Sequence, residues 1–138
     1  MTDSPPATPP GTAPTTPPAR SLEYQPYTGL TAHASQPRAA GGPAMHRAGL
    51  VIGEWSLERA AWTDLHQHDE ITVLLEGSLT VSAGEERVTL RPGDRVAVPA
   101  GKRARYEASH YARMLFIYGP SGDGHATIDG RYEALGPQ

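Results

Sequence analysis

Short apolar runs alternate with turn residues from about residue 48 to residue 118. The runs are rich in Val, Ile, Leu and Thr, and Gly, Pro, Asp or Glu separates them, as in strands joined by tight turns. No window of helical length carries an apolar stripe of comparable strength. The chain is therefore predicted to be all-β, a sandwich or small barrel. The predicted strands span residues 49–53, 55–57, 59–63, 71–75, 78–82, 87–91, 95–98, 103–108 and 112–118.

The first 44 residues differ in composition from the rest. Half of the 14 prolines lie in the first twenty residues, among Thr, Ala and Gly. Such a segment has too little apolar surface to offset the entropy lost on ordering, so we expect disorder with polyproline-II character. Residues 21–44 stay open, because their prolines and glycines argue against a regular element. The side chains that could dock on the domain are Leu22, Tyr24, Tyr27 and Leu30.

These compositions predict three segments. Residues 1–44 form a Pro/Thr/Ala-rich arm, disordered or loosely docked, and residues 45–120 form the β-barrel. Residues 121–138 form a tail, in which residues 128–135 add a strand or a short terminal turn. A chain of 138 residues allows one such domain and little more.

Charge and cysteine content exclude several classes of function. A net charge of -3 and a pI near 6.0 give no general attraction to nucleic acid or anionic membranes. No stretch approaches the roughly 18 apolar residues that span a bilayer, and the start of the chain does not resemble a secretory signal. The absence of cysteine rules out disulfides and thiolate chemistry. We expect a cytoplasmic protein that binds neither nucleic acid nor membrane.

The segment 66–77, which reads His-Gln-His-Asp-Glu-Ile-Thr-Val-Leu-Leu-Glu-Gly, carries the strongest candidate for chemistry. His66, His68 and Glu70 are spaced two apart, so on an extended strand their side chains would share one face. Two imidazoles and a carboxylate could hold Fe, Mn, Ni or Zn with open coordination positions. The alternative is a barrel mouth in which these groups hydrogen-bond to one another and to water.

Two motifs resemble the signatures of the cupin superfamily. The first is His66-x-His68, then Glu70, then Gly77. The second begins Gly93-Asp94 and, after four residues, continues Pro99-Ala100-Gly101. The resemblance covers roughly residues 48–120 and implies a single cupin jelly-roll barrel with its site inside one mouth. It also implies a histidine at the end of the second motif, where this chain has Ala104, which cannot bind metal.

Shorter pieces are similar to the cupin domain of the EutQ family of ethanolamine-utilisation proteins. They are Trp62-Thr63, Asp69-Glu70-Ile71, Leu75-Glu76-Gly77, the Pro-Gly-Asp turn at 92–94 and the closing residues 113–120. That family also lacks the full ligand set of the superfamily, and the resemblance implies a role in ethanolamine breakdown. Cupins commonly pair through their outer sheets, so the resemblance also implies a homodimer.

Other residues are candidates for the ligand pocket. Tyr106 shares the parity of Ala104 and should face inward, where its hydroxyl could orient a ligand or act as a weak acid, or simply be satisfied in the core. Trp62 and Thr72 are expected to line the pocket. His110 could supply the missing ligand, although a histidine at such a turn is more often exposed.

Three functions follow as alternatives. The first is a EutQ-like small cupin that binds a small molecule, with or without one divalent metal, in an accessory role in small-amine metabolism. The second is a metal-dependent enzyme of dioxygenase or isomerase type, which needs open coordination sites and an acid or base. The third is a non-catalytic binding or regulatory cupin whose Pro-rich arm recruits a partner.

Overall fold

The computed structural model describes residues 22–120 and 127–136, and these residues form ten strands and no helix. None of them forms a helix that could cross a bilayer. The strands are β1 (Thr31–His33), β2 (Gln36–Gly41), β3 (Met45–Arg47), β4 (Leu50–His66), β5 (Glu70–Gly77), β6 (Leu79–Ala83), β7 (Glu86–Leu90), β8 (Arg95–Val98), β9 (Arg103–Tyr118) and β10 (Thr127–Ala134).

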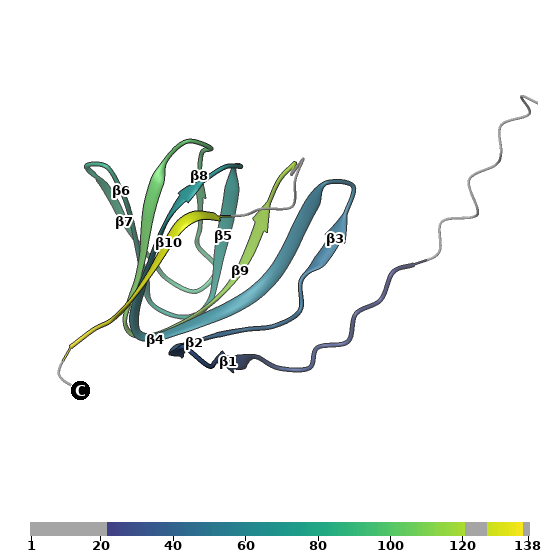
Figure 1. Cartoon of the computed structure of the whole chain (residues 1–138), viewed down its shortest axis with the longest axis horizontal. Coiled ribbons are helices and arrows are strands. Elements are labelled where there is room, and N and C mark those ends of the chain that lie inside the picture. The colour runs from purple at the N-terminus through teal and green to yellow at the C-terminus, as the bar shows by residue number, and fades with distance from the viewer. Residues whose placement is uncertain (1–21, 121–126, 137–138) are drawn as a thin grey trace, which may run out of the picture.

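Two long antiparallel strands, β4 and β9, form the spine of the sheet (Figure 1). They pair from Val51 with Tyr118 to Leu65 with Arg103. On its far edge β9 pairs with β5 and β6, and β4 pairs with β2, β3 and β10. The strands curve into a roll that encloses the core, whose largest fully buried side chains include Leu57, Leu74 and Met114. The predicted all-β jelly roll is confirmed.

Strand β4 is one element of 17 residues, where the sequence predicted three short strands. The break expected near Glu58 is a β-bulge: Arg59 has φ 47°, and the pairing with β9 shifts between Glu58 and Ala60. At this bulge two residues of β9, Ser109 and His110, lie opposite the single residue Arg59, so the inward face of β4 changes from odd-numbered to even-numbered residues. The side chains that point into the roll are Val51, Trp55 and Leu57 before the bulge, and Ala60, Trp62, Asp64 and His66 after it.

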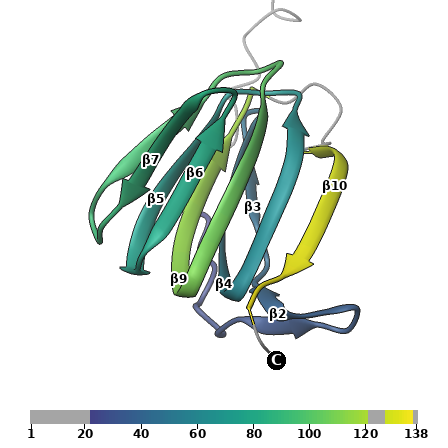
Figure 2. The ribbon, with the colours of Figure 1, turned by 90° about the vertical axis from the view of Figure 1, so that its left-hand side faces the viewer.

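The predicted strands 103–108 and 112–118 are likewise a single element, β9. Its even-numbered residues face inward along most of its length, and the exposed Ser109 and His110 form the bulge opposite Arg59. The sequence does not reveal this continuity, because Ser-His reads as a turn. The strand expected over residues 128–135 is present as β10, which lies beside β4 (Figure 2).

Part of the predicted arm belongs to the sheet. Residues 31–41 form the hairpin β1–β2, and β2 pairs with β4 from Ala39 with Leu57 to Gly41 with Trp55. The expectation that prolines and glycines prevent a regular element here was wrong, since Pro37 lies in a strand near the edge of the sheet, where it is tolerated. Leu22, Tyr24 and Tyr27 remain largely exposed. The disorder expected for residues 1–20 lies outside the described residues.

Candidate functional site

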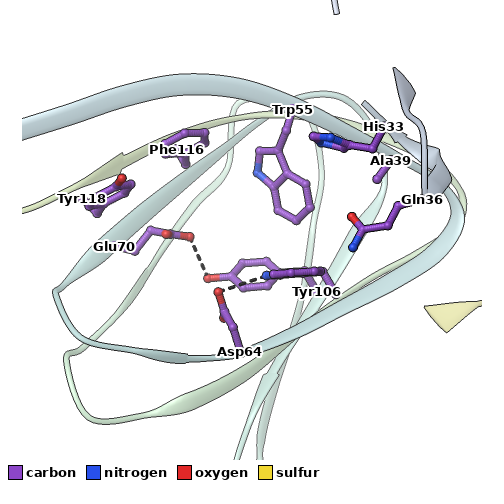
Figure 3. A pocket seen from close by; sticks show the side chains of 10 residues that line it. His33, Gln36, Ala39, Trp55, Asp64, Glu70, Tyr106, Phe116 and Tyr118 are labelled. Atoms are coloured by element: carbon purple, nitrogen blue, oxygen red, sulfur yellow. Dashed lines mark hydrogen bonds between the residues drawn. The ribbon is translucent and has the colours of Figure 1, made fainter. Parts of the chain in front are cut away.

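A cavity of about 220 Å³ opens between the hairpin β1–β2 and the inner face of β4, β5 and β9 (Figure 3). Its walls are mainly aromatic, and its two carboxylates, Asp64 and Glu70, lie near the hydroxyl of Tyr106, whereas His33 lies at the hairpin end. The size suits a small organic molecule, below the range of most drug-sized sites. The lining residues are His33, Gln36, Ala39, Trp55, Trp62, Asp64, Glu70, Tyr106, Phe116 and Tyr118.

His66 and Glu70 reach the interior from two strands joined by a turn. The sequence predicted them on one extended piece, but β4 ends at His66 and β5 begins at Glu70. The turn between them is fixed against the following loop: Gly101 N donates to His66 O at 2.8 Å, and Ala100 N donates to Asp69 Oδ1 at 2.8 Å. Both side chains therefore lie inside. Because residues 66–70 do not form one continuous strand, the alternation of faces along a strand does not place His68 beside them.

Four polar side chains form one buried cluster. His66 Nε2 lies 2.9 Å from Asp64 Oδ1 and 3.2 Å from the Tyr106 hydroxyl, which donates to Glu70 Oε1 at 3.1 Å. Because Tyr106 gives its proton to Glu70, Nε2 of His66 must carry a proton to contact Asp64 and Tyr106 favourably. Trp62 Nε1 donates to the other Asp64 oxygen at 3.0 Å. The cluster thus presents two carboxylates, held by neighbouring donors.

Burial and mutual charge shift the pKa values in this cluster. Burial raises the pKa of Glu70, and the Asp64 carboxylate adds to this, while the charge of His66 opposes it. Burial alone would lower the pKa of His66, but the contact with Asp64 and the charges of Glu70 and Asp64 outweigh it, so the pKa is raised. Burial, followed by the Glu70 charge, raises the pKa of Tyr106 far above its usual range, so Tyr106 is a neutral donor.

The other predicted site residues lie in different places. His68 is half-buried and stacks on Tyr118, with ring centroids 5.9 Å apart and an interplanar angle of 9°. Thr72 is fully buried but does not line the cavity, whereas Trp62 does. His110 is exposed on β9. Tyr106 faces inward, on the side that the alternation predicts.

The donor set does not fit the metal that the cupin motif implies. Across residues 22–120 and 127–136, no group of three or more His, Asp or Glu side chains is placed to hold a metal ion. His66 Nε2 is engaged by Asp64 and Tyr106, and the ring of His68 is stacked on that of Tyr118. Ala104, at the position of the motif's last histidine, is buried and pairs across the sheet with Asp64. The arrangement of these side chains thus gives no support to a metal held by His66, His68 and Glu70, and this metal site stays a prediction.

Sequence reasoning missed several residues of the site. Asp64 continues the spacing of two that links Trp62 and His66, and this signal was available. Trp55 was hidden by the bulge, which puts it on the same face as Trp62 despite an odd separation. His33 and Gln36 come from the hairpin β1–β2 and gave no signal in the sequence.

The stability of the folded chain is expected to fall as pH rises from about 5 to 8. Glu70 and His66 both have raised pKa values, so the folded state binds more protons than the unfolded state across this interval. Thermal unfolding followed by circular dichroism should show a melting temperature that decreases with pH in the wild type. The decrease should be smaller in Glu70→Gln, and equal slopes in the two proteins would contradict this origin.

Comparison with known proteins gives the same architecture. The model of the cupin domain family matches residues 55–118. No curated protein sequence gives a significant match. Many solved structures share the fold.

Three of these structures illustrate the likeness. The EutQ protein of Clostridium difficile is 17% identical, with a TM-score of 0.54 over 61% of this chain and 64% of that one, so this chain spans just under two thirds of its length. A protein described as ethanolamine utilization protein Q from Salmonella typhimurium is 20% identical over 61% and 71%, with a TM-score of 0.56. An RmlC-like cupin from Shewanella frigidimarina is 12% identical over 75% and 95%, with a TM-score of 0.63. At these identities the likeness shows the fold alone.

Proposed function

Because residues 55–118 of this chain form a cupin domain, we propose that the cavity in its roll binds a small molecule and that this molecule is a positively charged amine. The observation that carries the proposal is the pair of buried carboxylates, Asp64 and Glu70, at one end of an aromatic cavity. No Lys or Arg is among the described residues that line this cavity. Carboxylates and aromatic faces both attract cations, and water-poor surroundings strengthen the attraction.

The charges within the cluster favour a ligand with one positive charge. His66 carries a raised pKa and lies against Asp64, so these two groups largely compensate each other. Glu70 accepts a hydrogen bond from the neutral hydroxyl of Tyr106, and burial raises the pKa of Glu70 by more than the charge of His66 lowers it. An ammonium group beside Glu70 would supply the missing counter-ion. The rings of Trp55 and Phe116 line one wall of the cavity (Figure 3).

The biological role proposed is an accessory one in small-amine metabolism. Two structural neighbours carry the name EutQ, and one is described as an ethanolamine utilization protein. A cavity that suits a small ammonium ion agrees with such a role for this chain. Genes for ethanolamine ammonia-lyase or microcompartment shell proteins beside this gene would support the pathway, and unrelated neighbours would oppose it.

The predicted homodimer is part of the same proposal. Large apolar side chains, among them Leu50, Ile71 and Leu75, are exposed on the sheet. Such surfaces often mark contacts between proteins. The cytoplasmic location also stays a prediction.

The ligand class can be tested with three molecules of similar shape: n-butylamine, 1-butanol and butyrate. The chain has two tryptophans, Trp55 and Trp62, and both line the cavity, so tryptophan fluorescence reports directly on the site. Titrations at pH 7.5, checked by calorimetry, should show that the amine binds at least about tenfold more tightly than the other two. Equal or tighter binding of butyrate, or no binding of the amine, would overturn the proposal.

The same titration, repeated with a chelator, separates this function from the metal-dependent one. We expect amine binding to be unchanged by the chelator, because the carboxylates act directly. Elemental analysis of untagged protein provides the second measurement. A stoichiometric metal that is lost in His66→Ala/His68→Ala, together with chelator-sensitive binding, would favour the metal site and the enzyme alternative.

A further inference from the structure

The hairpin β1–β2 supplies one wall of the cavity from outside the matched cupin domain. The family match begins at residue 55, whereas His33, Gln36 and Ala39 lie in residues 31–41 and line the cavity. The hairpin is held in place by the pairing of β2 with β4. The residue that follows β10 also holds the hairpin, since Arg38 Nη1 donates to Leu135 O at 3.0 Å. The site therefore combines the matched residues with a wall that lies before them in the chain.

Gln36 presents an amide group without a partner to this cavity. Its side chain is half-buried and makes no hydrogen bond to any of the described residues. Figure 3 shows the amide on the side of the cavity away from Glu70, with Tyr106 between them. Trp55, whose ring lies edge-on to Tyr106 at 5.9 Å between centroids, forms the wall that connects the two ends. The cavity thus has an acidic end and an opposite end that carries the amide of Gln36 beside the imidazole of His33, and aromatic surface joins the two ends.

Resting on the proposed amine function, we infer that the ligand is bifunctional: an ammonium group at one end and a neutral hydrogen-bonding group, such as a hydroxyl or amide, at the other. Gln36 is the residue that selects the second group. An amide both donates and accepts, so it pairs with a hydroxyl or with another amide in either orientation. A purely alkyl tail would displace water from the amide without replacing the hydrogen bond that the water made, and this loss weakens binding.

The inference is tested with pairs of ligands that have equal numbers of heavy atoms. The first pair is 3-amino-1-propanol and n-butylamine, and the longer pair is 5-amino-1-pentanol and n-hexylamine. In at least one pair, wild-type protein should bind the amino alcohol about fivefold more tightly than the alkylamine, as expected for one net hydrogen bond. In Gln36→Leu this preference should disappear, while the alkylamine binds as well as before or better.

A control and two outcomes make the test decisive. Gln25→Leu changes an exposed glutamine on the same N-terminal segment, whose amide donates to Ala44 O outside the cavity, and it should keep the wild-type preference. Circular dichroism shows whether each variant is folded. Alkylamine binding without any preference in wild type, or a preference that survives in Gln36→Leu, overturns the inference but leaves the amine function standing. Failure of every amine to bind would overturn the proposed function itself.

Discussion

Glu70→Gln is expected to weaken amine binding by between about tenfold and about a hundredfold, because a hydrogen bond to a charged group contributes about 1.5–3 kcal/mol. The amide keeps the shape of Glu70 and can still accept from Tyr106, but it cannot balance the charge of an ammonium ion. In the wild type the affinity should also increase as pH rises through the raised pKa of Glu70, because the bound cation requires the ionised form. In the variant this pH dependence should be lost.

The stability of the same variant distinguishes a lost counter-ion from a damaged fold. The buried carboxylate disfavours the folded state near neutral pH, so Glu70→Gln should melt at the same temperature as wild type or higher at pH 8. Glu76→Gln is the matched control, since Glu76 lies on the same strand, is exposed and pairs with Arg113 outside the cavity. An unchanged amine affinity in Glu70→Gln, or an equal loss in Glu76→Gln, would contradict the role of Glu70.

Gly77→Ala is expected to destabilise the fold by about 3 kcal/mol or more, enough to leave much of the protein unfolded. Gly77 has φ 85°, and a Cβ at this position would overlap the carbonyl oxygen of Tyr111. That oxygen accepts from Ser78 N at 3.0 Å, so neither backbone segment can move away without breaking the turn between β5 and β6. Chemical denaturation of purified protein, or the yield of soluble protein, measures the effect.

Gly84→Ala provides the comparison for backbone strain without overlap. Gly84 also has a positive φ, 61°, but a Cβ there would meet no atom within 4 Å. Its cost should therefore be limited to about 1 kcal/mol, the usual penalty for alanine in the left-handed region. If the two variants lose the same stability, the close approach to Tyr111 is not the cause.

The sequence predicted the class of fold well, because its signals are local. The β-branched apolar run 71–75 predicts a strand by composition, and the alternation in residues 95–98 follows from one more deeply buried face of that strand. The turn at Gly93-Asp94 is also readable: Gly93 has φ 93°, and Asp94 Oδ2 accepts from Arg91 N at 2.9 Å. Gly77 marks the reversal between β5 and β6. In each case the residue type and the backbone conformation determine each other.

The composition of the site was less accessible, because it depends on pairing over long distances. A periodicity of two cannot reveal a bulge, so Trp55 could not be assigned to the face of Trp62. The hairpin that carries His33 and Gln36 is stabilised by its partner β4, not by its own sequence. His68 obeys the spacing of the motif, yet its ring stacks on Tyr118 from a turn, where the rule of alternating faces does not hold.

The bulge at which Arg59 faces Ser109 and His110 decides which side chains of β4 enter the interior. If β4 and β9 paired without this bulge, Ala61, Thr63 and Leu65 would point inward in place of Trp62, Asp64 and His66. The interior would then lose Asp64 and His66, whereas Glu70 and Tyr106, which come from β5 and β9, would stay inside. A shift of one residue between β4 and β9 thus decides whether the roll holds one buried carboxylate or two.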